Sequence, residues 1–278
     1  MVLSWAPSFN LGARQRGSGL PPGKARLRPT TVRPLRHLKL VKSVICLPTY
    51  NERENIESMV RVLGDLGLEG LEVLVIDDAS PDGTGEIADR LAAELSWVHV
   101  LHRERKEGLG PAYLAGFRRA LELGADLVFE MDCDFSHDPD DVPRLAAAAG
   151  DADLVLGSRY VEGGGTRNWG LLRRFISRGG SLYAQMLLQL GIRDLTGGFK
   201  CYRRAVLETI DLDEISSRGY AFQIETTYRT LRAGFRVVEV PIVFADREVG
   251  GSKMSKSIVL EAIWKVPLLR GRALFGRL

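Results

Sequence analysis

Apolar residues recur along the chain in two patterns, short uninterrupted runs and longer segments with helical spacing. The run at 44–47 ends at Pro48, and residues 51–66 then carry apolar side chains three or four positions apart. Short apolar runs bounded by turn formers are typical of buried strands, and a 3.6-residue spacing predicts an amphipathic helix. These patterns predict strands at 44–47, 71–76, 98–102, 127–131 and 154–157. They predict helices at 51–66, 86–95, 110–123 and 140–149.

Strands that alternate with helices in this way predict an α/β fold, with helices on both faces of a mostly parallel sheet. Ligands of such sheets bind beyond the carboxyl ends of the strands. Four segments with polar or charged residues fall at such strand ends, at 48–52, 77–78, 132–134 and 158–159. We therefore expect these four segments to meet at one edge of the sheet and to form the ligand site.

The second half of the chain has a different pattern. Glycines at 163–165 predict a flexible loop, the spacing over 169–190 predicts a helix, and the apolar residues of 237–244 predict another strand. From Lys256 onward an amphipathic helix is predicted. Its apolar side consists of Ile258, Val259, Ala262, Ile263 and Val266. No run of 18 uncharged apolar residues occurs in the sequence, so no transmembrane helix is predicted.

Charge divides the chain into three regions. The net charge of +3 combines +9 over residues 1–42 and +5 over residues 247–278 with −11 over the residues between them. An acidic body with basic ends is not typical of a nucleic-acid-binding core, so no nucleic-acid partner is expected. It suits a protein that uses a divalent cation to handle phosphates and lays its basic end on an anionic membrane.

Composition sets the expected domain boundaries. Residues 1–40 are rich in Gly, Pro, Ser and Arg and lack a sustained period. We interpret them as a disordered basic extension, with a transit peptide as the alternative. Residues 41–252 form the predicted folded domain, and 253–278 a basic amphipathic segment that either contacts a membrane surface or docks as a core helix. The three cysteines are isolated, which argues against disulfides and structural zinc and fits a reducing cytosol.

The acidic cluster Asp132-Cys133-Asp134 follows the predicted strand at 127–131. Two carboxylates two residues apart can share a hard divalent cation, Mg²⁺ or Mn²⁺, that also bridges a diphosphate. Taken alone, the pattern is also typical of a solvated acidic loop. Phosphatases of the haloacid dehalogenase type carry a similar motif after a strand, but on their first strand, whereas here it follows the fourth.

Two further segments specify the chemistry. They are Leu47-Pro48-Thr49-Tyr50-Asn51-Glu52 and Val75-Ile76-Asp77-Asp78-Ala79-Ser80-Pro81-Asp82-Gly83-Thr84. Alone, the second could be a turn with a helix cap, since Asp, Ser and Gly are common turn formers. Together, and followed by the acidic cluster, they resemble the nucleotide-binding signatures of family-2 glycosyltransferases. The resemblance implies a single A-type glycosyltransferase domain with a nucleotide-binding sheet, catalytic over 41–252.

Later motifs narrow this resemblance. In chain order they lie at 131–137, 157–160, 168–169, 176–179, 194–200, 219–223 and 250–255. With them the chain is similar to the polyprenol (dolichol) phosphate mannose synthases, most closely the actinobacterial ones, from about residue 42 to about residue 270. Cys133 departs from the Ala usual in that family, which keeps the side chain small but makes it sensitive to oxidation.

The resemblance implies a reaction and the residues that perform it. The reaction is transfer of mannose from GDP-mannose to a polyprenyl monophosphate in the bilayer, with Mg²⁺ or Mn²⁺ as cofactor. The implied nucleotide contacts are Pro48, Tyr50, Glu52, Ile76, Asp78 and Cys133. The implied metal and pyrophosphate ligands are Asp132, Asp134 and Ser136. The implied contacts to the donor phosphates or sugar are Arg159, Arg247 and Lys253. Together with Asp132 and Asp134, these three residues form the implied catalytic set. The implied contacts to the acceptor phosphate are Arg173 and Ser177.

The chemistry of these residue types agrees with those roles. Arginine recognises phosphate in bidentate fashion and keeps its charge at any physiological pH. Lys253 lies in a Gly-Gly-Ser-Lys loop flexible enough to close over a donor. Without the resemblance, Arg173, Arg174 and Arg178 would be interpreted as a solvated helix face.

The acceptor determines the expected mechanism. A lipid phosphate is already an anion at pH 7, so no general base is required, in contrast to a hydroxyl acceptor. We expect a single displacement with inversion that gives a β-linked mannosyl phosphate. His137 is expected to fix its loop by a hydrogen bond or to begin a helix rather than to act in catalysis.

Other functions remain open on the sequence. A UDP-glucose-dependent glucosyltransferase acting on the same lipid is the alternative within the class. A non-catalytic nucleotide-binding interaction module is the alternative outside it, and the intact acids and Arg159 argue against it. The expected location is cytoplasmic and peripheral, on the inner face of the membrane, with a membrane-anchored partner protein as a further candidate contact.

Overall fold

The structure is a computed structural model that describes residues 41–246 and 256–275. Two of the expected site residues, Arg247 and Lys253, lie outside the described residues, and so does the expected extension at 1–40. The site is therefore built below from the other expected residues.

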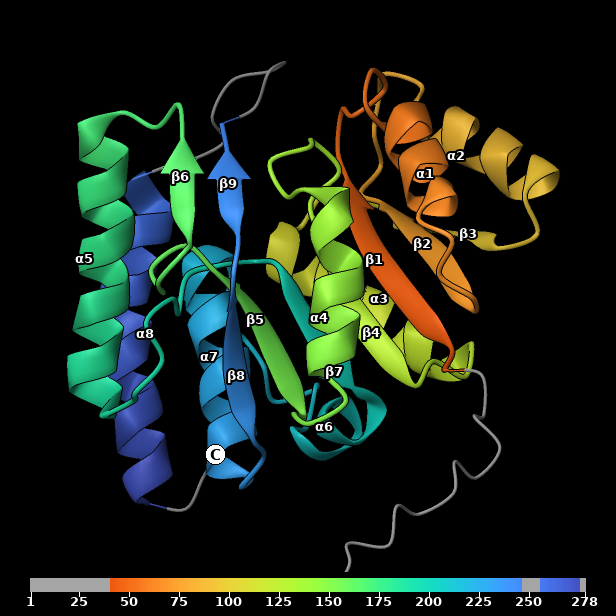
Figure 1. The fold of residues 1–278 in the computed structure, drawn as a ribbon. Helices are drawn as coiled ribbons and strands as arrows, with labels where there is room; N and C mark the ends of the chain where they lie inside the picture. Colours follow the sequence, from red (N-terminus) through yellow and green to blue (C-terminus); the bar gives the residue numbers. More distant parts are fainter. Residues whose placement is uncertain (1–40, 247–255, 276–278) are drawn as a thin grey trace, which may run out of the picture. The chain divides into compact units, whose positions relative to one another are not determined.

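The described chain alternates strands and helices, as the hydrophobic pattern predicts (Figure 1). The strands are β1 (Ser43–Thr49), β2 (Leu71–Asp77), β3 (Val98–His102), β4 (Leu127–Glu130), β5 (Leu154–Ser158), β6 (Gly165–Arg167), β7 (Lys200–Arg203), β8 (Val237–Pro241) and β9 (Val243–Ala245). The helices are α1 (Ile56–Asp65), α2 (Thr84–Glu94), α3 (Leu109–Glu122), the 3₁₀ turn η1 (Pro139–Asp141), α4 (Val142–Ala148), α5 (Leu171–Leu188), α6 (Arg204–Thr209), α7 (Gly219–Arg232) and α8 (Lys256–Leu274).

One sheet contains seven of the strands, in the order β3-β2-β1-β4-β7-β5-β8. β7 pairs antiparallel with β4 and β5, and the other neighbours pair in parallel, so the predicted mostly parallel sheet is confirmed. The chain proceeds from β1 to β2 and β3 on one side, and then crosses to β4 on the other side. The carboxyl ends of β1 and β4 therefore flank a topological switch point, which is where open α/β sheets bind ligands.

The first strand shows why its sequence is an uninterrupted apolar run. Val44 and Cys46 belong to one buried cluster, whereas Ile45 and Leu47 belong to another. Successive side chains of a strand point to opposite faces of the sheet. Because helices cover both faces, every position of β1 from Val44 to Pro48 is apolar and no alternation appears.

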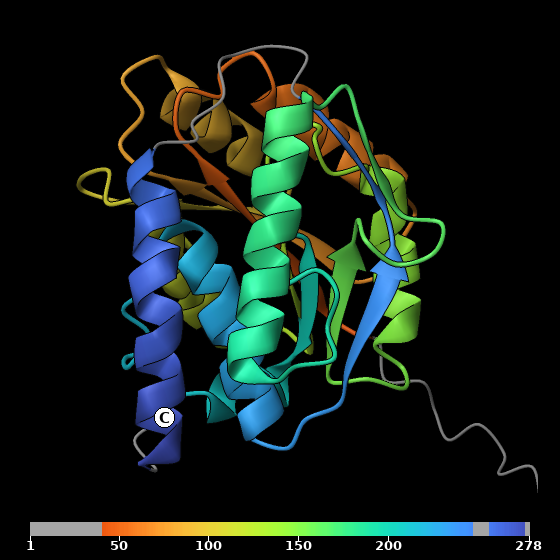
Figure 2. The same ribbon diagram turned by 90° about the vertical axis from the view of Figure 1, so that its left-hand side faces the viewer.

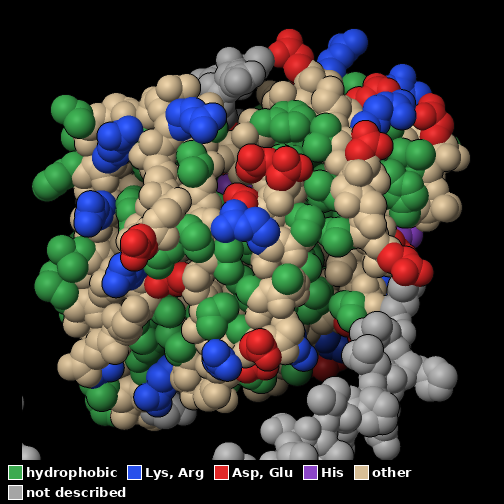
Figure 3. Space-filling view, viewed as in Figure 1, with side chains coloured by type: hydrophobic (Ala, Val, Ile, Leu, Met, Phe, Trp, Pro, Cys, Tyr) green, Lys and Arg blue, Asp and Glu red, His purple; other side chains and the backbone are tan. Residues whose placement is uncertain are grey.

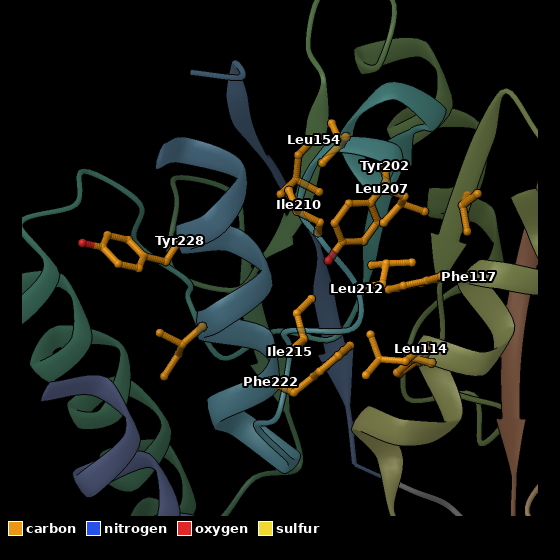
Figure 4. Packing of buried hydrophobic residues seen from close by; sticks show 14 of the residues in the cluster. Leu114, Phe117, Leu154, Tyr202, Leu207, Ile210, Leu212, Ile215, Phe222 and Tyr228 are labelled. Atoms are coloured by element: carbon orange, nitrogen blue, oxygen red, sulfur yellow. The ribbon is translucent and has the colours of Figure 1, made fainter. Parts of the chain in front are cut away.

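The two clusters divide the helices between the faces of the sheet. One cluster contains residues of α1, α2 and α4, and the other contains residues of α3, α5, α6, α7 and α8. In the second cluster Phe117 of α3 packs against Tyr202 of β7, with ring centroids 5.4 Å apart, and against Phe222 of α7 at 6.4 Å (Figure 4). These rings fix α7 against the sheet, and α7 carries part of the site described below.

The region between 191 and 236 departs from the sequence expectation, because no element was predicted there and β7, α6 and α7 are present. β7 has the sequence Lys-Cys-Tyr-Arg and buries Lys200, so it lacks the apolar run of a central strand. α7 is buried nearly all round, and its buried positions include Gln223, Glu225 and Thr226 as well as Ile224 and Tyr228. Buried polar side chains interrupt the apolar spacing of α7 and the apolar run of β7, so hydrophobic periodicity does not single out these elements.

The prediction of a single strand at 237–244 is wrong. The segment forms β8, which pairs with β5, and β9, which pairs with β6 in a separate two-stranded sheet. Ile242 lies between them, and its N–H donates to the carbonyl of Ser158. The chain thus changes sheets at this point, which an uninterrupted apolar pattern does not reveal.

The C-terminal helix predicted from Lys256 is present as α8. Val266 is fully buried and packs in the same cluster as α7, together with Leu269 and Ala273. Ile263 is 45% exposed, so the predicted apolar side that joined it to Val266 is wrong. The side chains of 256–260 and 262 lie outside the description. Within the described ranges, no helix combines the length and apolarity needed to cross a bilayer.

Candidate active site

A pocket of about 610 Å³ lies at the carboxyl ends of β1 and β4. The four segments expected to meet at this edge of the sheet all contribute to it, through Pro48, Thr49, Tyr50, Glu52, Asp78, Asp132, Cys133, Asp134 and Arg159. The other lining residues are Lys106, Gly108, Leu109, Ala112, His137, Trp169, Arg173, Thr196, Gly198, Arg218, Gly219, Tyr220, Gln223, Phe244 and Glu261. Arg173 of this second group was an expected site residue. Several others, for which no ligand contact was expected, belong to the motifs at 131–137, 168–169, 194–200 and 219–223.

The two nucleotide-binding signatures are joined by hydrogen bonds. The N–H of Asn51 donates to Ser80 Oγ at 3.1 Å, and the N–H of Glu52 donates to Thr84 Oγ1 at 3.0 Å. The Thr84 hydroxyl in turn donates to Asp82 at 2.6 Å. The second signature is therefore also the turn that its composition suggests, and it holds the loop after β1 in place, whereas Gly83 at the start of α2 makes no side-chain cap.

Asp78 and Tyr50 form the expected nucleoside end of the pocket with two cationic residues that sequence reasoning missed. Arg103 donates to Asp78 and also to Glu107, the latter at 2.6 Å. Burial raises the pKa of Asp78 above its usual value, although the Arg103 charge acts to lower it. The ammonium of Lys106 lies 3.5 Å from the centre of the Tyr50 ring. A basic segment after the third predicted strand was the available signal.

Three of the expected residues lie outside the pocket lining and act from behind it. The Ile76 side chain is fully buried in the core. Ser136 donates to Asp134 Oδ1 from its N–H at 3.1 Å and from its hydroxyl at 2.5 Å. The Ser177 hydroxyl accepts a hydrogen bond from Tyr160 at 2.8 Å. Their positions favour a supporting role over direct ligand contact.

His137 holds the loop that carries the acidic cluster. Its Nδ1 accepts a hydrogen bond from the N–H of Asp132 at 3.1 Å, so the neutral ring carries its proton on Nε2. The ring is buried and stacks on Phe199 at a centroid distance of 4.9 Å. This is the loop-fixing hydrogen bond that the sequence reasoning expected of His137.

The acidic cluster offers hard oxygen ligands for a divalent cation. Asp132 and Asp134 both line the pocket. Among the described residues, no group of three or more His, Cys, Asp and Glu side chains is arranged to hold a metal ion. Mg²⁺ and Mn²⁺ prefer six oxygen ligands, and two carboxylates leave room for phosphate oxygens and water. The residues therefore fit a cation that binds together with a diphosphate.

Arg159 and Arg173 form a cationic side of the pocket around Trp169. The guanidinium carbon of Arg173 lies 4.2 Å from the centre of the indole ring, and that of Arg159 lies 5.3 Å from it. Arg159 is bound by Asp194, and Arg173 donates to Asp246 at 2.5 Å. An aromatic face attracts cations, so the indole allows two guanidinium groups to lie near one another.

Two helices begin at the pocket. Gly108 and Leu109 at the start of α3 line it, and so do Gly219 and Tyr220 at the start of α7. Neither start is capped by a side chain in the described part of the chain. Helix N-termini present free N–H groups and a partial positive charge, which favours phosphate binding.

Comparison with known proteins agrees with this geometry. Residues 44–211 match the model of the family described as glycosyl transferase family 2. The undecaprenyl-phosphate mannosyltransferase of Micrococcus luteus is 54% identical over 222 residues, which are 79% of this chain and 90% of that protein. The polyprenol monophosphomannose synthase of Mycolicibacterium smegmatis is 47% identical over 266 residues, which are 94% of this chain and 95% of that protein.

The fold is also found in solved structures. Glucosyl-3-phosphoglycerate synthase from Mycobacterium tuberculosis, in complex with Mn²⁺, uridine diphosphate and glucosyl-3-phosphoglycerate, matches with a TM-score of 0.63. It is 21% identical and the match covers 83% of this chain and 80% of that one, so the likeness concerns the fold. The family match spans more than half of the chain, includes both signatures and the acidic cluster, and contradicts the phosphatase alternative. The chain belongs to glycosyl transferase family 2.

Proposed function

We propose that the protein transfers mannose from GDP-mannose to a polyprenyl monophosphate, giving β-mannosyl phosphoryl polyprenol. The observation that carries the proposal is a single pocket with Asp132 and Asp134 on its wall and Arg159 and Arg173 beside Trp169. Carboxylates that share a cation suit the donor diphosphate, and guanidinium groups suit a second phosphate. The names of the two relatives support mannose and a polyprenyl phosphate, and the signature segments support the nucleotide.

Two buried donors beside the pocket support the acceptor site. Arg173 Nε and Trp169 Nε1 are buried, and neither has a hydrogen-bond partner among the described residues. Buried N–H groups are rarely left unpaired in folded proteins. Two unpaired donors on adjacent side chains suit an anion, and the lipid phosphate of the proposed acceptor is one.

The proposed mechanism needs positioning more than proton transfer. The acceptor phosphate oxygen is already anionic at pH 7 and attacks the anomeric carbon directly. His137 is engaged with the Asp132 N–H and is not required as a base. Attack from the face opposite the departing diphosphate inverts the anomeric centre. A bound Mg²⁺ or Mn²⁺ would stabilise the negative charge that develops on the leaving nucleotide.

An exposed apolar face supports peripheral contact with the membrane that holds the lipid. α5 and α8 lie side by side, and Tyr183 of α5 donates to the carbonyl of Ile263 on α8 at 2.9 Å (Figure 2). The exposed apolar side chains of this face are Leu171, Leu172, Phe175, Leu182 and Met186 on α5 and Ile263, Trp264, Leu268 and Leu274 on α8, with Phe275 directly after it. Apolar side chains and Lys or Arg side chains alternate along the α5 edge (Figure 3).

The same helix links this face to the acceptor site. Arg173, which lines the pocket, lies in the first turn of α5, between the exposed Leu172 and Phe175. If this end of α5 rests on the bilayer, the polyprenyl chain can stay in lipid while its phosphate reaches Arg173. We propose the inner face of the membrane as the location. The alternative is that this face binds a membrane-anchored partner protein and does not contact lipid directly. Binding of the purified protein to liposomes distinguishes the two.

The decisive experiment is a transfer assay with two donors. The purified protein is incubated with Mg²⁺, polyprenyl phosphate in detergent and either labelled GDP-mannose or labelled UDP-glucose, and label in the organic phase is counted. We expect lipid-linked label from GDP-mannose and a one-bond carbon–proton coupling that identifies a β-anomeric centre. Faster transfer from UDP-glucose would assign the glucosyltransferase function. Nucleotide binding without transfer from either donor would assign the non-catalytic module.

A further inference from the structure

The side-chain amide of Gln223 is buried at the pocket wall without a partner. Gln223 lies in α7, is 2% exposed and lines the pocket. Neither its Oε1 nor its Nε2 makes a hydrogen bond with any described residue. A buried polar group that loses its water and gains no partner destabilises the fold. An amide left in this state beside a pocket therefore points to a bound ligand as its partner.

The backbone beneath this amide is held rigidly. The carbonyl of Gln223 accepts hydrogen bonds from the Lys200 ammonium at 2.9 Å and from the Thr227 hydroxyl at 3.0 Å. Burial raises the pKa of the nearby Glu130, and the Gln223 amide acts to lower it, so the amide lies within reach of that carboxylate. Neither the amide nor Glu130 Oε2 reaches hydrogen-bond geometry with a described residue. Gln223 is thus fixed at its backbone, while its side chain has capacity left for a ligand.

The amide faces the reaction centre through Gly198. A Cβ at position 198 would lie 3.3 Å from Gln223 Nε2 and 4.0 Å from His137 Cε1. His137 accepts a hydrogen bond from the N–H of Asp132 and so positions the acidic cluster. The space beside Gly198 therefore has the Gln223 amide on one side and His137 on the other. Glycine at 198, itself part of the lining, leaves the amide uncovered by a neighbouring side chain. The ligand group that reaches it is therefore close to the diphosphate site.

We infer that Gln223 binds a hydroxyl of the donor hexose and positions the sugar for attack. The inference rests on the proposed function and names the residue that holds its sugar. A primary amide offers a donor and an acceptor side by side, which matches a hydroxyl that both donates and accepts. It is also neutral. A carboxylate at this position would repel both the donor diphosphate and the acceptor phosphate, whereas an amide contacts the sugar without that repulsion.

The first test separates the sugar from the nucleotide. Calorimetry in Mg²⁺ compares the affinities for GDP-mannose and for GDP in the full-length protein, in Gln223→Met and in Gln185→Met. Gln185 lies on α5, and its amide donates to the Arg193 carbonyl outside the pocket, so it is the matched control. We expect Gln223→Met to lose roughly five- to tenfold in affinity for GDP-mannose, the size of one neutral hydrogen bond, with GDP unchanged.

An equal loss of affinity for GDP-mannose and GDP, or no loss for either, would overturn the assignment. Gln223 would then be a structural residue that packs beside Glu130. The wild-type protein keeps this result apart from failure of the proposed function. If it prefers UDP-glucose, mannose is refuted as the donor sugar, and the same comparison of UDP-glucose with UDP tests Gln223. If it binds no nucleotide sugar, the proposed function and this inference both fail.

The second test uses charge, and the unfolding free energy is measured beside the transfer rate, because a carboxylate at 223 would also repel the buried Glu130. Gln223→Glu keeps the shape of the side chain and adds an ionisable group. We expect its transfer rate to fall more than tenfold below wild type at pH 8, and the ratio to wild type to recover as the pH is lowered towards 5.5. Recovery follows because the protonated carboxyl is neutral, as the amide is. A ratio that stays constant across this range would contradict a position next to the reacting phosphates.

Discussion

The carboxylate of Asp194 binds the guanidinium of Arg159 in bidentate fashion, with Nε–Oδ2 at 2.7 Å and Nη2–Oδ1 at 2.6 Å. The backbone N–H of Arg159 donates to the same carboxylate at 3.0 Å. Both side chains are buried. One carboxylate thus fixes the backbone and the side chain of an arginine at the pocket wall, and joins the motif at 194–200 to the motif at 157–160.

Removal of this carboxylate should destabilise the fold strongly. Asp194→Asn leaves the buried Arg159 charge uncompensated, and breaking a buried ion pair in this way typically costs about 3–5 kcal/mol. The free energy of unfolding in urea measures the effect. Glu57→Gln is the control, because Glu57 pairs with Arg61 at the exposed surface, where solvent screens the pair and a much smaller loss is expected. Similar values for the two variants would contradict the structural role of Asp194.

Part of the stability that this ion pair gives to the fold should be lost in acid. Burial raises the pKa of Asp194, but the charge and hydrogen bonds of Arg159 outweigh it and hold the pKa below its usual value. A carboxyl whose pKa is lowered by folding stabilises the fold above its unfolded pKa, and this contribution is lost as the pH falls through the folded pKa. The difference in unfolding free energy between wild type and Asp194→Asn should therefore be constant from pH 8 to 5 and shrink below about pH 4. A difference that grows in acid would exclude this linkage.

The first half of the fold could be predicted from the sequence, because its strands are buried on both faces. The strands β1, β2 and β5 consist mainly of apolar residues, and polar residues lie at their carboxyl ends, where the sheet faces a ligand. That pattern located Asp78, Asp132 and Arg159 before any contact was known. It also located the acidic cluster at the end of the fourth strand, beside the switch point between β1 and β4.

The second half could not be predicted in the same way. α7 buries Thr226 and Arg229, which bond to Lys200 and Glu225, and the unpaired amide of Gln223, beside apolar residues such as Phe222 and Tyr228. Such contacts are set by tertiary structure and leave no period in the sequence. Lys106 of the pocket lies in a basic segment that the sequence does show, but its role depends on the Tyr50 ring that the fold brings near it.

Transfer should depend on the charge of Asp134 and not on its hydrogen bonds. Asp134→Asn keeps the Oδ1 that accepts from the Ser136 N–H and hydroxyl, and removes only the negative charge. We expect the transfer rate to fall at least about 100-fold, since loss of one group that stabilises developing charge has this size. Chelation of divalent cations should lower the transfer rate of the wild type to a similar level. The unfolding free energy of Asp134→Asn should differ little from that of the wild type. Retained activity in Asp134→Asn would remove the metal-binding role proposed for the cluster.

Binding to lipid should depend on the exposed face of α5 and α8. Phe175 and Leu268 are 78% and 60% exposed, and replacing both by Ser removes their apolar side chains. The affinity for anionic liposomes, measured by sedimentation, should fall about tenfold or more. The reason is that burying each side chain in lipid contributes about 1.5–3 kcal/mol. Val62→Ser on α1 is the control, since Val62 is exposed on a helix of the opposite face. Point substitutions are sharper here than deletion of 267–278, because Leu269 of that segment packs in the core. Unchanged sedimentation of the double variant would refute direct contact with lipid, and recruitment would then require a membrane-anchored partner protein.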